Sequence, residues 1–176
     1  MKYLTIPKVA FLPPAPAGSL LLAEVAESSR WCIPTTFVEG RPRPAVIVLA
    51  PFTENDLGVP WLDFSEIQKP ASVFAEWKPV PELDADKFNA DGYGKIGELG
   101  ALIYTESGEV FLQCAMQDSD AVFYYNFGDK TASFQPPNEP SVAILRWSAV
   151  IELEDPIRFH TLFHVEASGM RSDTKR

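Results

Sequence analysis

The stretch from residue 100 to 134 constrains the fold more than any other, because short apolar segments alternate there with turn residues. Residues 101–105 and 110–116 are rich in β-branched and aromatic side chains, and Gly108 between them can supply the positive φ of a tight hairpin. Both faces of this hairpin carry large apolar groups, so it lies between two packed layers or inside a closed barrel. Two further segments extend it into an antiparallel meander: residues 121–127 and 131–134.

Other segments point to the same fold class. Residues 45–50 form a continuous apolar run between two prolines, typical of a central strand. Residues 142–154 and 157–166 alternate between apolar and polar side chains and predict two long strands that pair antiparallel. Residues 20–27 suit either a strand or a helix. We therefore expect a mainly β protein, an antiparallel β-sandwich or partly open barrel with one or two short helices around residues 63–77, and we find no internal repeat.

The chain of 176 residues fits one folded domain. Residues 1–18 are proline-rich and predict an extended arm, because proline fixes φ and denies the helical conformation to its predecessor. Residues 19–176 predict a single β-rich domain. Within it, residues 78–100 show no clear period, and a connection of that length often has a function. An extended arm can add a strand to the sheet edge of another chain.

Charge and cysteine content narrow the function. Lys plus Arg number 15 and Asp plus Glu 24, so the net charge is 15 − 24 = −9. This balance argues against nucleic-acid and anionic-membrane partners, which favour basic surfaces. Cys32 and Cys114 allow at most one disulfide and have no metal-ligand spacing. Pro7 and Lys8 break the first apolar run, so we expect no signal peptide and a cytoplasmic location, or one within an assembled particle.

A possible cation site lies in the long connection. Residues 89–96 resemble the first eight positions of an EF-hand calcium loop, with Asn89 and Asp91 as its first and third positions. Gly100 stands where the bidentate acid belongs, whereas a register two residues earlier places Glu98 there. The resemblance implies a weak Ca²⁺ site with Asn89, Asp91 and Glu98 as ligands. The alternative is a plain polar turn, no metal and no cofactor, which we expect.

Two other patterns bear on chemistry. Residues 18–25, followed after a loop by residues 43–49, are loosely similar to the opening of the RNA-cleaving toxins of the MazF and PemK type. That resemblance implies a small barrel in which Arg43 acts in phosphodiester cleavage, although the family's later catalytic threonine has no clear match. Otherwise Arg43 is a loop cation. His160 and His164 would share a metal on a helix, but on a strand they lie ~13 Å apart.

No nucleophile elbow or phosphate loop occurs in the sequence. We therefore expect a non-catalytic structural or protein-interaction module, a subunit of a larger assembly such as a virion-type accessory protein. A protein partner or self-association follows from this. One alternative is a MazF-like enzyme. Another is a small-molecule-binding β-barrel lined by six aromatic residues: Tyr104, Phe111, Phe123, Tyr125, Phe127 and Trp147.

Overall fold

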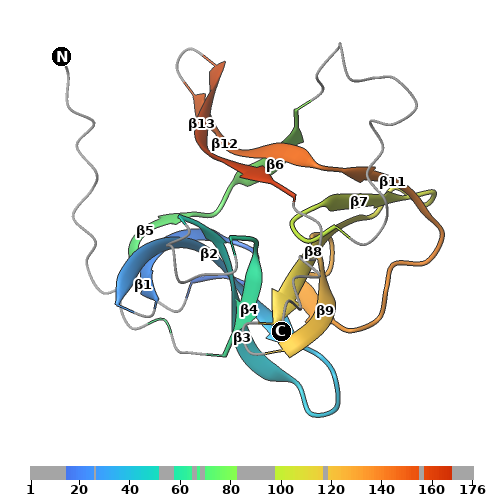
Figure 1. The fold of residues 1–176 in the computed structure, drawn as a ribbon. Helices are drawn as coiled ribbons and strands as arrows, with labels where there is room; N and C mark the ends of the chain where they lie inside the picture. The colour runs from blue at the N-terminus through green and yellow to red at the C-terminus, as the bar shows by residue number, and fades with distance from the viewer. Residues whose placement is uncertain are drawn as a thin grey trace, which may run out of the picture.

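Thirteen strands in two sheets make up the described part of the chain (Figure 1). The computed structural model describes residues 15–25, 27–51, 58–64, 67, 70–82, 98–116, 119–154 and 157–167. The predicted arm lies outside these residues up to position 14. The mainly β prediction is confirmed.

The strands fall into two groups along the chain. The first group is β1 (Leu20–Val25), β2 (Ser28–Phe37), β3 (Arg43–Ala50), β4 (Trp61–Asp63), β5 (Pro70–Phe74) and β6 (Trp77–Pro81). The second group is β7 (Leu102–Thr105), β8 (Val110–Met116), β9 (Ser119–Asn126), β10 (Thr131–Ser133), β11 (Pro140–Ile144), β12 (Arg146–Glu154) and β13 (Ile157–Glu166).

Six of these strands close a barrel in the order β2-β3-β4-β8-β9-β10, with β10 returning to β2. Neighbouring strands are antiparallel except at two seams, where β4 runs parallel to β8 and β10 runs parallel to β2. β1 and β5 continue the sheet from β2, while β7 and β11 continue it from β8. The closed barrel replaces the sandwich or partly open barrel expected from sequence. Closure pairs strand edges that would otherwise be exposed.

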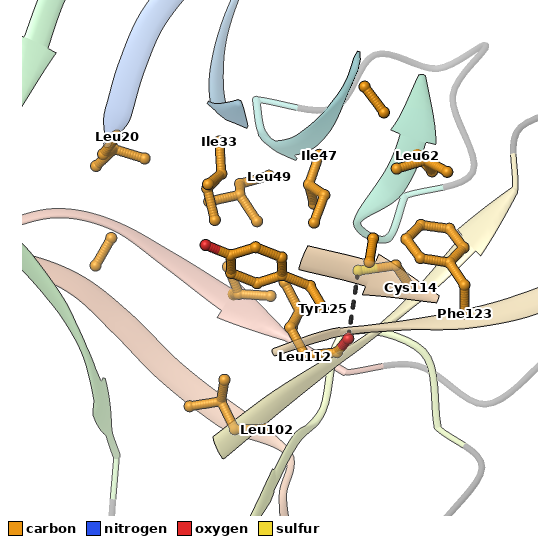
Figure 2. Close-up of a cluster of buried hydrophobic side chains, with 14 of the residues drawn as sticks. Leu20, Ile33, Ile47, Leu49, Leu62, Leu102, Leu112, Cys114, Phe123 and Tyr125 are labelled. Atoms are coloured by element: carbon orange, nitrogen blue, oxygen red, sulfur yellow. Dashed lines mark hydrogen bonds between the residues drawn. The ribbon is translucent and has the colours of Figure 1, made fainter. Parts of the chain in front are cut away.

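Side chains from alternate positions of the barrel strands fill its interior, as the period of two requires (Figure 2). Ile33, Ile47, Leu112 and Tyr125 come from four different strands, and each is at most 1% exposed. Burying a side chain of this size stabilises the fold by about 1.5–3 kcal/mol. The same apolar pattern that predicted strands therefore supplies the core.

The second sheet, in the order β13-β12-β6, lies over one end of the barrel (Figure 1). Trp147 and Ala149 of β12 and Val165 of β13 belong to the same buried cluster as the barrel interior. The antiparallel pairing of β12 and β13 confirms the predicted pairing of residues 146–154 with residues 157–166. The single long strand expected over residues 142–154 is wrong at its start, because residues 142–144 belong to β11, which pairs with β7. At the opposite end of the barrel, where the β2–β3 hairpin turns, no strand of the described chain covers the opening.

The helices expected around residues 63–77 are wrong wherever those residues are described. Asp63 ends β4, Pro70 to Phe74 form β5, and Trp77 begins β6; residues 65, 66, 68 and 69 lie outside the description. Pairing of β5 with β1 overrides the weak helical preference of so short a segment. Residues 20–25, left open between helix and strand, form β1 for the same reason.

The strands β1 to β6 and β7 to β12 repeat one topology, which the sequence did not reveal. In each set the first two strands form a hairpin, strands two to four form a barrel meander, and strand five pairs with strand one. Leu20 pairs with Phe74 in the first set, and Leu102 pairs with Ile144 at the equivalent place in the second. Both ladders are interrupted by a register shift after their third pair.

Candidate interaction surface

Aromatic side chains gather at the end of the barrel that the second sheet leaves uncovered. Phe37 ends β2, Phe64 follows β4 and Phe134 follows β10. Phe37 is buried, and its ring centroid lies 5.6 Å from that of Phe64 and 5.2 Å from that of Phe134, both edge-on. Val38 and Arg43 complete the group, which we call the aromatic rim. Phe64 and Phe134 occupy equivalent positions in the two strand sets, because each directly follows the last residue of its set's fourth strand.

The rim holds three of the five exposed large apolar side chains among the described residues. Phe64 is 37% exposed, Val38 39% and Phe134 42%. The described residues include two other exposed large apolar side chains, Val80 and Phe159, and both belong to the second sheet. Single exposed apolar residues are ordinary, whereas a contiguous group of them is a candidate docking surface.

Arg43, the residue singled out in the sequence, is the first residue of β3 and is exposed. Its guanidinium carbon lies 3.6 Å from the ring centroid of Phe64 and 5.6 Å from that of Phe37. This is a cation–π arrangement, which holds the guanidinium plane against the rim. Among the described residues Arg43 makes no ion pair, so its N–H donors are free to bind a carboxylate or phosphate.

The remaining metal and thiol candidates assemble no site in the described chain. Asn89 and Asp91 lie outside the described residues, and the backbone carbonyl of Glu98 accepts a hydrogen bond from the amide of Ala101. No group of three or more His, Cys, Asp or Glu side chains could hold a metal ion in the described part. The calcium resemblance therefore stays a prediction.

Both cysteines are free and buried. Burial raises the pKa of the Cys32 thiol to about 12 and that of Cys114 well above its ordinary value. Because the thiolate is the reactive form, neither is suited to be a nucleophile at neutral pH.

The six aromatic residues of the predicted ligand barrel serve as packing groups. Phe123, Tyr125 and Trp147 are at most 1% exposed within the main core cluster, and Tyr104 and Phe127 pack against it. Phe111 packs against a separate cluster on the outside of the barrel. Five of the six therefore pack in or against the main core, and Phe111 lies outside it.

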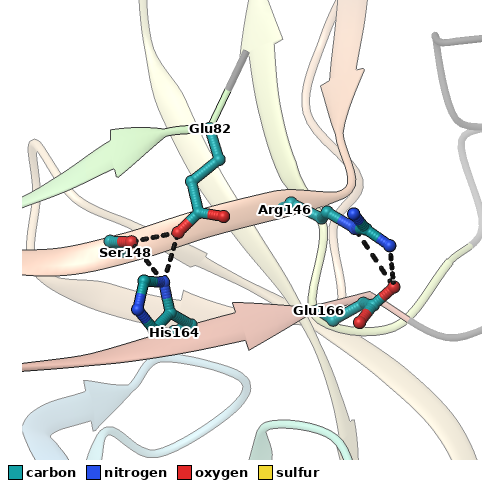
Figure 3. Close-up of polar contacts among 5 residues, drawn as sticks. All are labelled: Glu82, Arg146, Ser148, His164 and Glu166. Atoms are coloured by element: carbon teal, nitrogen blue, oxygen red, sulfur yellow. Dashed lines mark hydrogen bonds and ion pairs between the residues drawn. The ribbon is translucent and has the colours of Figure 1, made fainter. Parts of the chain in front are cut away.

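A polar cluster lies on the second sheet (Figure 3). Glu82, directly after β6, accepts hydrogen bonds through Oε1 from Ser148 Oγ and from His164 Nδ1. Ser148 Oγ and His164 Nδ1 are themselves 2.9 Å apart, and Arg146 donates to Glu166 at 2.7 Å beside them. The hydrogen bond from Ser148, and then that from His164, lowers the pKa of Glu82.

This cluster has the residue types of a hydrolytic triad but not its geometry. A triad needs the hydroxyl on one imidazole nitrogen and the carboxylate on the other. Here Ser148 and Glu82 both meet Nδ1 of His164, and the serine proton is taken by Glu82. The cluster therefore ties the end of β6 to β12 and β13. His160, the other histidine of β13, is exposed and apart from it, as the strand spacing predicted.

Sequence reasoning found Arg43 but missed its aromatic partners and missed Glu82. The available signal was a large apolar residue placed directly beyond a strand end, among turn residues, as at Phe64 and Phe134. Glu82 carried no signal, since it follows two prolines in a segment without a clear period.

No protein-family model, curated protein or solved structure matches this chain. The described residues include no helix long and apolar enough to cross a membrane. The function proposed below therefore rests on geometry and charge.

Proposed function

We propose that this protein is a non-catalytic interaction module that docks a partner protein on its aromatic rim, as a subunit of a larger assembly. The supporting observation is the gathering, at the uncovered end of the barrel, of two exposed phenylalanines and a guanidinium that makes no ion pair within the described residues. Aromatic and arginine side chains are the types that dominate binding energy at protein interfaces. Since Phe64 is 37% and Phe134 42% exposed, a partner that buries the exposed part of either gains about 0.6–1.3 kcal/mol, the corresponding share of the about 1.5–3 kcal/mol for a whole side chain.

The two arginines of the β2–β3 hairpin define the charge that the partner should carry, since the carboxylate of Glu39 on the same hairpin already accepts a hydrogen bond from the amide of Phe134. Arg41 and Arg43 are both exposed on the β2–β3 hairpin, in a chain whose net charge is −9. An apolar segment that carries carboxylates fits this surface, because its side chains cover the phenylalanines while a carboxylate pairs with the guanidinium. A second copy of the chain fits less well, since it brings −9 toward −9. A nucleic acid is disfavoured for the same reason.

Small probes can test this chemistry before a partner is known. We would titrate 3-phenylpropionate into ¹⁵N-labelled protein and follow the backbone amide shifts of Phe64 and Phe134. Its 11 non-hydrogen atoms, at about 0.3 kcal/mol each, give roughly −3 kcal/mol and a Kd of a few millimolar. We expect saturable shifts at the rim, and weaker ones with the cationic analogue 3-phenylpropylamine.

Two variants and one matched control sharpen the test. Arg43→Gln should remove the preference for the carboxylate over the amine, and Phe134→Ser should abolish the rim shifts. Phe159→Ser removes a 65% exposed phenylalanine from β13 and should change nothing at the rim. Shifts spread over both sheets, or an identical response in Phe134→Ser, would refute a docking surface at the rim.

A further inference from the structure

The two strand sets share more than their topology, because the same side chains recur at equivalent places. Trp77 begins β6 and donates its indole N–H to the carbonyl of Gly18 at 2.8 Å. Trp147, near the start of β12, donates its indole N–H to the carbonyl of Gly100 at 2.9 Å. Each glycine stands two residues before the first strand of its own set. Each tryptophan stands seven residues after a proline that opens the fifth strand.

The backbone around these two glycines repeats as well. Gly18 and Gly100 both adopt positive φ, +83° and +89°. The amide of Gly18 donates to the carbonyl of Pro34 on β2, and that of Gly100 donates to the carbonyl of Gln113 on β8. The residue after each glycine donates to the carbonyl three positions back.

The space around the glycines repeats too. A Cβ built on Gly18 would meet Lys130, directly before β10, and one built on Gly100 would meet Pro60, directly before β4. In both cases the neighbour belongs to the other strand set. Each set therefore completes the packing of the other at an equivalent place.

Where the two sets meet in the second sheet, their pairing is that of a two-fold interface. β6 pairs antiparallel with β12, so that Pro79 lies opposite Ala149, its own equivalent. On either side, Trp77 pairs with Ile151 and Trp147 pairs with Pro81. In a two-fold contact between identical subunits, residue i of the first subunit meets residue j of the second, and residue j of the first meets residue i of the second.

The structure assigns this chain as an intramolecular dimer: two equivalent units, β1–β6 and β7–β12, which pair as identical subunits would. Tandem duplication of one unit of the chain explains this arrangement. Neither unit can close the barrel alone, because the seams between β4 and β8 and between β10 and β2 join one unit to the other. The covalent link through residues 83–97 is then not needed to hold the units together. This inference is independent of the function proposed above.

The units differ where only one has been extended. The amide of Glu82 donates to the carbonyl of Arg146. Counting back from Glu82 along β6, the backbone N–H and C=O groups of alternate residues therefore face β12 and the outer edge of the sheet. Pro79 and Pro81 fall on the outer edge and lack an N–H, which blocks the addition of a further strand there. Their equivalents on β12 are not prolines and face β13. The prolines therefore account for an added strand on one unit and not on the other.

Cutting the link in the folded protein tests the inference. We would replace part of residues 83–97 with the recognition sequence of a site-specific protease, cleave the native protein, and compare cut with uncut chains. The two fragments should elute together at the volume of the intact chain and give its circular dichroism spectrum. They should separate only under denaturing conditions.

Thermal melting supplies the decisive readout. Once cut, the folded pair unfolds to two separate molecules, so its Tm should depend on protein concentration. With the average unfolding enthalpy for 176 residues, the expected fall is about 4 °C for each tenfold dilution. The uncut chain carrying the same recognition sequence should melt at one Tm at all concentrations. Fragments that part on a sizing column, or a cut protein without a native spectrum while the uncut one keeps it, would overturn the intramolecular dimer.

Discussion

The hydrogen bonds from the two tryptophans to the two glycines predict unequal losses of stability on substitution. Trp147 is fully buried, so Trp147→Phe leaves the carbonyl of Gly100 without a donor, at about 1–3 kcal/mol. The missing half of the indole leaves a cavity of about 40 Å³, which at about 24 cal/mol per Å³ adds roughly 1 kcal/mol. We therefore expect Trp147→Phe to lower the free energy of unfolding by about 2–4 kcal/mol.

Trp77→Phe is the matched substitution in the other unit. Trp77 and Gly18 are only partly buried, so water can reach the carbonyl that loses its donor. The expected loss is about 1–2 kcal/mol, since the desolvation penalty is smaller. The order of the two effects follows from burial alone, because the hydrogen bonds are otherwise alike.

Urea unfolding followed by far-ultraviolet circular dichroism measures both losses without relying on the fluorescence of the residue removed. The m-value should stay constant, because neither variant changes how much surface unfolding exposes. A loss below about 0.5 kcal/mol for Trp147→Phe, or a larger loss for Trp77→Phe, would show that the reasoning from burial and hydrogen bonding is wrong.

Three further predictions follow. By urea unfolding, Gly100→Ala should lower the free energy of unfolding by about 2–4 kcal/mol and Gly18→Ala by about 1–2 kcal/mol. Both glycines have positive φ, but the new Cβ of Gly100 meets a proline ring at 3.1 Å, whereas that of Gly18 meets a flexible lysine side chain. Glu82 has a lowered pKa in the folded state, so the stability that its carboxylate contributes is present above the unfolded pKa of about 4.3 and is lost as the pH falls through the folded pKa. Glu82→Gln should therefore lower the free energy of unfolding by only a few tenths of a kcal/mol at pH 7 and by nothing in acid. Cys32 and Cys114 should not react with a thiol reagent in the native protein at pH 8, and both should react in denaturant, as absorbance would report.

The strands were predictable where their side chains alternate over a long stretch. Residues 146–154 and 157–166 alternate so regularly that only a strand could bury one side of them, and they form β12 and β13. Residues 142–144 continue the same alternation but belong to β11, so the alternation did not reveal where one strand ends and the next begins. The prediction of helix around residues 63–77 was wrong at β5 because a five-residue strand carries too few positions to establish a period. Its identity is decided by pairing with β1, 50 residues away in the sequence, which no local pattern contains.

The aromatic rim could not be predicted for a related reason. Phe37, Phe64 and Phe134 are far apart in the sequence, and each looks like an ordinary residue at a strand end. Phe37 and Phe64 become neighbours because β2 and β4 flank β3, and the parallel seam between β10 and β2 brings Phe134 to them. Arg43 was noticed through the proline that follows it, whereas its contact with Phe64 depends on the pairing of β3 with β4, which no local pattern contains.

The repeat escaped notice because most of the positions that define it tolerate many side chains. Leu20 and Leu102, or Phe74 and Ile144, need only be apolar, and loops of different length separate them. The two strand sets keep the same residue type only at equivalent positions where the backbone conformation and packing allow few other side chains. A glycine is needed at positive φ beside a close neighbour, and an indole is the side chain that can both fill the core and reach that glycine's carbonyl. Two glycines and two tryptophans therefore record the repeat more clearly than the apolar pattern of the whole chain.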